Sequence, residues 1–168
     1  MNLAEMEKLL VQSPVMSMLR EIQRVNNERF AIIVAHGVVE ILTNALIEHH
    51  CRKAKDIVSD NKTYPHSTKL LILFEKGVLD EKGYKTLTDF RKLRNDAAHG
   101  GIFTVTKAML DKFSVKFTNE TTTQAKMIFL CNEIVMQFWG AHTDVFTPYF
   151  MIEPIGVPKV RVRKPETP

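Results

Sequence analysis

The stretch "FAIIVAHGVVEILTNALI", Phe30–Ile47, decides the fold class, because it is almost wholly apolar yet keeps polar residues at a regular interval. His36, Glu40 and Asn44 stand four residues apart, which places them on one face of a helix. These polar groups inside an apolar run favour a buried helix of a soluble bundle over a membrane span. We therefore expect this segment to be a core helix, and we expect no transmembrane segment.

The apolar pattern also extends toward the N-terminus. Ser13 and Pro14 form a typical helix start, since a capping side chain is followed by proline at the first helical position. The spacing predicts one long helix from Pro14 to about Ala45, kinked at Gly37, and a shorter helix before it over Leu3–Gln12. The predicted core stripe of the long helix comprises Val15, Met18, Leu19, Ile22, Val25, Phe30, Ile33, Val34, Gly37, Val38, Ile41 and Ala45.

Capping residues and glycine stops divide the rest of the chain. After a polar loop, the segment "TKLLILFEKG" predicts a helix that is capped by Ser67 or Thr68 and stops at Gly77. Asp80 caps the next helix, which ends before the paired glycines that begin at Gly100. The apolar side of that helix consists of Leu87, Phe90, Leu93 and Ala97.

The last third of the chain predicts a short helix or turn over Thr104–Phe113 and a long final helix that begins at Asn119. One face of this final helix carries Ala125, Ile128, Phe129, Asn132, Val135, Met136 and Trp139. Since strand-like alternation is scarce, the fold class is all-α, a small bundle of about five to six helices.

Composition changes near Pro148, so we expect a helical domain over residues 1–147 and an extended, basic, proline-containing tail over 148–168. The basic residues of the tail are Lys159, Arg161, Arg163 and Lys164. The tail is either a solvated end or a basic arm that binds RNA phosphates together with Arg91.

The net charge of +4 is a mild excess that favours polyanions without requiring them. Cys51 and Cys131 lie far apart without metal-ligand spacing, which indicates reduced thiols in a cytoplasmic protein. The first residues lack the basic start and apolar run of a secretory signal.

A candidate site lies in "DFRKLRNDAAHGG", Asp89–Gly101. Arginine offers a planar fork of donors to phosphate, and His99 stands in the last helical turn, where the helix dipole favours a positive charge, as suits a proton donor. The candidate catalytic residues are therefore Arg94, Asn95 and His99. A helix advances about 100° per residue, so Arg94 and His99 are about 140° apart and one straight helix cannot aim both at the same atom. Two copies meeting across a dimer would make the easier composite site.

The alternative reading is structural. In it Arg94 pairs with Glu40, a structural polar residue embedded in the apolar helix, and His99 only contacts terminal carbonyls. His36 and Glu40 are four residues apart, a spacing able to hold a metal, but nothing in the sequence completes a ligand set. We therefore expect a core polar network, no metal and no cofactor. "EHHC", Glu48–Cys51, indicates a solvated helix end.

The residues "RKLRNDAAHG" resemble the R-x4-H signature of the HEPN superfamily, with Arg94 and His99 at the signature positions and Asn95 at the polar position after the arginine. The wider stretch from Asn26 to Gly101 is similar to the mannitol-operon repressor family. That family's early acid and arginine and its later acid are matched here by Glu28, Arg29 and Glu40. A departure is Ala97, where the family's motif usually has an aromatic residue.

The resemblance implies a HEPN-like helical homodimer. In the ribonuclease members of the superfamily, the arginine and histidine cleave RNA without metal, and the 2′-hydroxyl attacks to leave a cyclic phosphate. The mannitol-repressor relatives instead regulate transcription through protein partners. The expected function is thus RNA binding or metal-independent RNA cleavage, with an antitoxin or regulator as a protein partner; the alternative is a non-catalytic regulatory module.

Overall fold

The computed structural model describes residues 14–24, 27–117 and 122–151. All regular structure in these ranges is helical, which confirms the all-α prediction. Its helices are α2 (Pro14–Arg24), α3 (Glu28–His50), α4 (Ala54–Ser59), α5 (His66–Glu75), α6 (Glu81–His99), α7 (Lys107–Leu110), α8 (Thr123–Ala141) and α9 (Thr143–Met151). They outnumber the five to six expected, because α4 lies in the predicted polar loop and the predicted final helix is followed by α9. The expected helix over Leu3–Gln12 and the basic residues of the tail lie outside the described residues.

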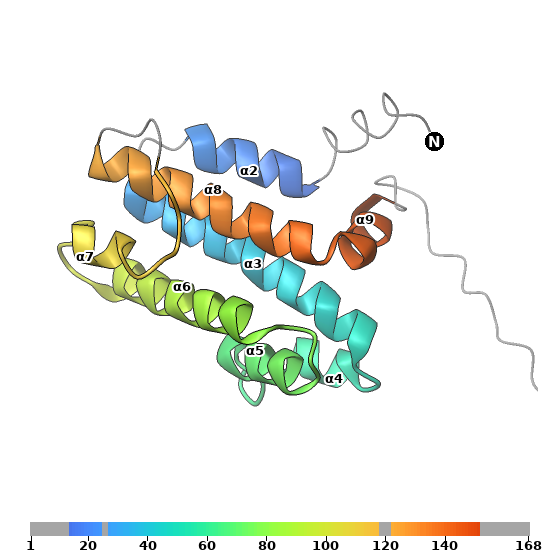
Figure 1. Cartoon of the computed structure of the whole chain (residues 1–168). Helices are drawn as coiled ribbons and strands as arrows, with labels where there is room; N and C mark the ends of the chain where they lie inside the picture. Colours follow the sequence, from blue (N-terminus) through green and yellow to red (C-terminus); the bar gives the residue numbers. More distant parts are fainter. Residues whose placement is uncertain (1–13, 25–26, 118–121, 152–168) are drawn as a thin grey trace, which may run out of the picture.

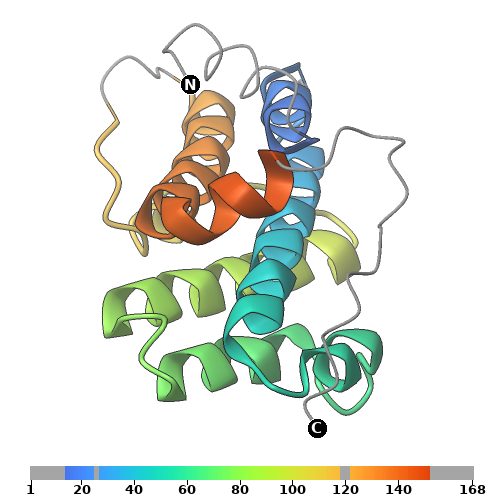
Figure 2. The ribbon, with the colours of Figure 1, turned by 90° about the vertical axis from the view of Figure 1, so that its right-hand side faces the viewer.

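Helix α3 is the centre of the bundle, and it contacts α2, α4, α5, α6, α8 and α9. Figures 1 and 2 show it running through the molecule, with α8 and α6 on different sides of it. The predicted stripe is partly wrong, since Phe30 and Ile41 are exposed while Ala31, Ile32 and Ala35 are buried. The helix is apolar nearly all round and is covered from several sides, so the apolar period alone could not identify its buried face.

The predicted single helix from Pro14 to Ala45 is wrong, because α2 ends at Arg24 and α3 begins at Glu28. Asn27 caps α3, and its side chain accepts a hydrogen bond from the backbone N–H of Phe30 at 3.1 Å. The break therefore comes from an asparagine cap, and α3 continues through Gly37 as one helix.

The C-terminal end of α5 and both ends of α6 follow the predicted signals. Gly77 adopts a positive φ of 68°, and the backbone N–H of Val78 bonds the carbonyl of Leu73, which completes a Schellman stop after α5. Asp80 caps α6 by accepting from the N–H of Gly83 at 2.7 Å. All four predicted core residues of α6 are buried: Leu87, Phe90, Leu93 and Ala97.

Helix α5 begins earlier than predicted. It starts at His66, directly after Pro65, and neither Ser67 nor Thr68 caps it. The carbonyl of Pro65 accepts the N–H groups of Thr68 and Lys69, so the backbone turn after the proline opens the helix. This start places His66 in the first turn of α5.

The C-terminal helices differ from the prediction in two respects. The predicted start at Asn119 lies outside the described residues, and Thr122 caps α8 through the N–H of Ala125. The buried face of α8 is also not the predicted one: it consists of Met127, Leu130, Cys131, Ile134, Val135 and Phe138, of which only Val135 was expected. The cause is the same as in α3, since apolar residues cover most of this helix.

Pro148 lies inside α9 rather than at the start of a tail. A proline within a helix removes one backbone hydrogen bond, so packing must hold this short element in place. Phe146 is buried, and the ring of Trp139 on α8 lies near those of Phe146 and Phe150, with centroids 5.3 and 5.7 Å away. Aromatic packing thus extends the folded helical part beyond the predicted boundary at residue 147.

Helix α3 is long and apolar enough to cross a membrane, judged by length and composition alone. Of the residues in its most apolar window, 61% are buried inside the bundle. Such burial is what a core helix requires, because its apolar surface is already covered by neighbouring helices.

Candidate functional site

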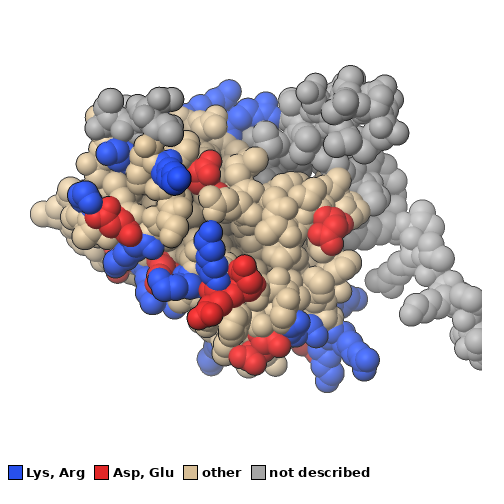
Figure 3. Space-filling model, viewed as in Figure 1, with Lys and Arg blue, Asp and Glu red and all other residues tan. Residues whose placement is uncertain are grey.

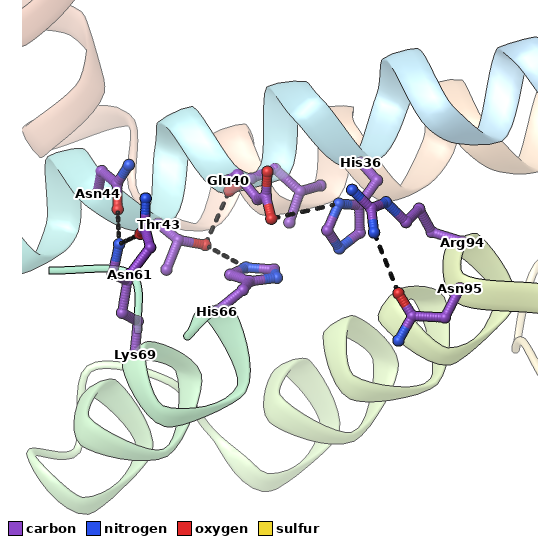
Figure 4. A network of polar contacts seen from close by, with 10 residues as sticks. His36, Glu40, Thr43, Asn44, Asn61, His66, Lys69, Arg94 and Asn95 are labelled. Atoms are coloured by element: carbon purple, nitrogen blue, oxygen red, sulfur yellow. Dashed lines mark hydrogen bonds and ion pairs between the residues drawn. The ribbon is translucent and has the colours of Figure 1, made fainter. Parts of the chain in front are cut away.

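The two ends of the R-x4-H motif point to different surroundings. Arg94 reaches from α6 toward His36 on α3, and its Nη1 donates to Asn95 Oδ1 at 3.2 Å (Figure 4). His99, the last residue of α6, is exposed and lines a surface hollow of about 460 Å³ together with Asn95 and Ile102. Arg94 is not among the residues that line this hollow. Within one chain the motif therefore does not form a joined arginine–histidine pair.

Arg29 fastens the end of α6 to the start of α3, a contact that sequence reasoning did not foresee. Its guanidinium donates to the carbonyl of Ala98 at 3.3 Å and to that of Gly101 at 3.5 Å. These carbonyls lie at a helix end, where backbone acceptors lack partners within the helix. The arginine thus holds in place the helix end that carries His99.

A second polar site lies between α3, α5 and α6. His36 and Glu40 on α3 face His66 at the start of α5, and each of the three offers one metal-ligand atom within 4.8 Å of the other two (Figure 4). His36 Nδ1 lies 3.7 Å from Glu40 Oε1, and the His36 and His66 ring centroids are 4.9 Å apart. We call His36, Glu40 and His66 the histidine cluster.

The structure corrects the expected role of Glu40. Its side chain is 44% exposed, and among the described residues the side chain in contact with its carboxylate is His36, at 3.7 Å, rather than Arg94. The picture of a buried carboxylate neutralised by Arg94 is therefore wrong. Exposure explains the difference, because a solvated carboxylate does not need a dedicated cation.

Burial lowers the pKa of His36 to about 4, and the neighbouring charges of Arg94 and Arg91 act in the same direction. Burial likewise lowers the pKa of His66 to about 3, with further contributions from His36, Arg91, Lys69 and Arg94. Both imidazoles are therefore neutral at pH 7.

Arg91, expected to contact RNA, lies near the histidine cluster. It is half-buried, its charge acts on both histidines, and its Nε has no hydrogen-bond partner among the described residues. It is not among the residues lining the hollow that contains Asn95 and His99. Arg91 therefore does not join Asn95 and His99 in one hollow.

Lys69 joins the loop before α5 to the central helix. Its side chain is buried, with its Nζ 2.8 Å from Asn61 Oδ1 and 3.1 Å from Asn44 Oδ1. A solvent-connected hollow of about 340 Å³ lies beside it. The lining residues of this hollow are Glu40, Asn44, Asn61, Pro65, His66 and Lys69. The histidine cluster therefore has an opening to solvent.

Charges on the described surface are mixed. On the face shown in Figure 3, basic and acidic side chains lie next to one another. Among the described ion pairs, Asp89 is flanked by Lys85 and Lys92 at 3.3 and 3.2 Å. Such pairing reduces the net attraction of this face for a polyanion. The expected phosphate contacts of Lys159, Arg161, Arg163 and Lys164 lie outside the described residues.

Both cysteines are free thiols. Cys131 is buried in the core, and burial raises the pKa of its thiol far above the ordinary value, which makes it unreactive. Neither cysteine takes part in the sites described above.

Comparison of the chain with protein-family models, with curated proteins and with solved structures finds no match.

Proposed function

We propose that this chain is a HEPN-like, homodimeric, metal-independent RNA-processing domain, in which the C-terminal ends of two α6 helices form one composite site. The observation that carries the proposal is the position of Asn95. Its amide accepts a hydrogen bond from Arg94 and also lines the hollow that contains His99. One side chain thereby connects the phosphate-binding arginine to the proton-transferring histidine.

A second copy is needed because Arg94 and His99 of one chain face different surroundings. Two large apolar side chains lie at the end of the bundle where Arg29 joins α3 to α6: Phe30 is 61% exposed and Ile102 is 98% exposed. Exposed apolar side chains at one place favour a protein–protein contact. A two-fold contact there would bring two motif-bearing helix ends together.

The chemistry assigns one role to each residue. Arg94 binds the non-bridging oxygens of the phosphate and stabilises the charge that develops on them. His99 transfers the proton as the 2′-hydroxyl attacks phosphorus and the bond to the 5′ oxygen breaks, which leaves a cyclic phosphate and a 5′-hydroxyl. Asn95 orients the arginine. Arg91 and the basic tail would add electrostatic attraction for the RNA.

The test incubates pure protein with mixed RNA in a chelator and compares wild type, Arg94→Ala and His99→Ala. We expect each variant to lose at least about 100-fold in cleavage rate, as for removal of a proton-transferring group at His99 and of a charge-stabilising donor at Arg94. Arg52→Ala and His49→Ala replace exposed residues of the same types outside the site and should cleave as wild type does. Equal cleavage by all proteins would mean a contaminating nuclease and would refute the assignment.

The second candidate is a non-catalytic regulatory module of the mannitol-repressor type. It is favoured by the half-buried position of Arg94 against α3, which a structural role also explains. If no protein cleaves RNA while Arg94→Ala loses stability or dimerisation, this candidate replaces the first. Either function, RNA processing or regulation of transcription, would place the protein in the cytoplasm.

A further inference from the structure

We propose that His36, Glu40 and His66 bind a divalent transition-metal ion of the zinc class. Sequence spacing pairs only His36 with Glu40; the third ligand comes from α5, which packs against α3. The ligand atoms of the three side chains all lie within 4.8 Å of one another. This proposal does not rest on the proposed RNA chemistry, which uses other residues and no metal.

Thr43 determines which nitrogen of His66 is free. Its single hydroxyl hydrogen is donated to the carbonyl of Val39 at 2.7 Å. The hydroxyl oxygen therefore accepts from His66 Nε2, 3.1 Å away, so that Nε2 carries the proton of the neutral ring. His66 Nδ1 is left with a lone pair, is buried, and has no hydrogen-bond partner within the described residues. Metal-binding histidines are commonly held in this way through their other nitrogen.

His36 supplies a second lone pair. Its residue is 2% exposed, and its Nε2 is buried without a hydrogen-bond partner in the described part of the chain. His36 Nδ1 lies 3.7 Å from Glu40 Oε1, beyond hydrogen-bond distance, so the contact with Glu40 does not fix the proton of neutral His36 on Nδ1, and Nε2 is the buried nitrogen without a partner. Burying unpartnered polar atoms is costly, so two such nitrogens in adjacent rings call for an electron-poor occupant.

The chemistry of the three side chains decides between an anion and a metal ion. An anion would need hydrogen-bond donors, whereas His66 Nδ1 can only accept, so repulsion from its lone pair disfavours phosphate. Imidazole nitrogens with one carboxylate suit zinc and related ions better than magnesium or calcium. The hollow beside Glu40 and His66 gives the fourth ligand position access to water.

Charge and geometry set the conditions for binding. Arg91, Arg94 and Lys69 oppose a cation, and Glu40 contributes the opposing negative charge. Ligand atoms about 2.1 Å from a tetrahedral ion lie roughly 3.4 Å apart, so the ligands must move closer than they are here. Glu40 can make this movement because its side chain is half-exposed.

The experiment titrates the metal-free full-length chain with Zn²⁺ by calorimetry near neutral pH, with Mg²⁺ as the comparison ion. We expect one Zn²⁺ per chain and no Mg²⁺ binding. Glu40→Gln and His66→Ala should each weaken Zn²⁺ binding by at least about tenfold, and Thr43→Val, which acts on the orientation and tautomer of His66, by about 10- to 100-fold. Co²⁺ bound in place of Zn²⁺ should give wild type a visible absorption spectrum typical of tetrahedral coordination. The Thr43→Val variant should show an altered spectrum.

The double variant His49→Ala/His50→Ala is the control, because it removes the adjacent histidines at the end of α3 outside the cluster. It should bind Zn²⁺ as wild type does. The proposal is overturned if only this control loses Zn²⁺ binding. It is also overturned if Glu40→Gln binds Zn²⁺ with the affinity of wild type. Absence of Zn²⁺ binding to wild type also overturns it and leaves a bridging water as the occupant. Glu40→Gln keeps the test decisive if His66→Ala does not fold, since position 40 is half-exposed. RNA cleavage in chelator is measured separately, so either proposal can fail alone.

Discussion

At the scale of single residues, two neutral histidines packed edge to face are the most unusual feature of the described structure. Their rings meet at an interplanar angle of 88°, beside the charges of Arg91 and Arg94. Protonating either ring would add a positive charge where positive charge already gathers. The cluster should therefore make stability depend on pH.

We expect the free energy of unfolding to fall as the pH drops from 7 to 5. Unfolded histidines take up protons near pH 6.5, whereas the pKa values of His36 and His66 in the folded chain are about 4 and 3. The unfolded state thus binds more protons in this window, and each histidine contributes up to about 1.4 kcal/mol per pH unit. The contribution is complete above pH 6.5 and is lost as the pH falls toward the folded values.

Urea unfolding of wild type and His66→Gln at several pH values checks this expectation. The variant should show a shallower dependence, by up to the contribution of one histidine, because glutamine takes up no proton. Identical slopes for the two proteins would contradict the assigned cost of charging His66.

At the scale of elements, the helix ends are where local sequence acts most directly. Asn27, Asp80 and Thr122 each cap a helix with their own side chain, and Gly77 ends α5 at a positive φ. These devices act over three or four residues and depend on local geometry alone.

Replacement of glycine by alanine should have opposite effects on stability at two positions. Gly77→Ala should destabilise the chain by about 1 kcal/mol, because an alanine is strained at a φ of 68°. Gly37→Ala should stabilise it by about 0.5–1 kcal/mol, since Gly37 lies inside continuous α3 and an added Cβ meets nothing within 4 Å. Chemical denaturation measures both. Destabilisation by Gly37→Ala would show that the glycine serves a contact beyond the helix itself.

At the scale of the whole molecule, the bundle exposes two large apolar side chains where Arg29 joins α3 to the end of α6. These are Phe30 and Ile102, which directly follow Arg29 and Gly101 in the chain, and the guanidinium of Arg29 donates to the carbonyl of Gly101. The packed core itself involves α3, α6 and α8, and does not need these two side chains.

The proposed dimer predicts that Ile102→Asp and Phe30→Asp shift the protein toward monomer, by at least about tenfold in dissociation constant, because a buried unpaired charge opposes the contact. Leu71→Asp is the control, since Leu71 is exposed on α5, a helix that carries neither Phe30 nor Ile102. Sedimentation at several concentrations gives the oligomeric state. A wild-type chain that stays monomeric throughout would refute the dimer.

The buried residues could be predicted from the sequence in α6 but not in α3 or α8, and the reason is physical. In α6, polar residues separate the apolar ones, so Leu87, Phe90, Leu93 and Ala97 were identified as core and are buried. In α3 and α8, apolar residues occur on nearly every side, so periodicity could not select the buried face. The break near Asn27 was missed because the apolar stripe ran across it and the asparagine cap was not recognised.

The sequence by itself determined the helical class, the glycine stop after α5, the cap at Asp80 and the separation of Arg94 from His99 around α6, because each depends on local geometry. Tertiary structure alone decided that His66 lies beside His36 and Glu40, that Arg94 contacts Asn95 rather than Glu40, and that Arg29 bonds the end of α6. These contacts join residues from separate helices, or depend on how a neighbouring helix is packed. Their formation follows from how α3, α5 and α6 pack, which no spacing along the chain encodes.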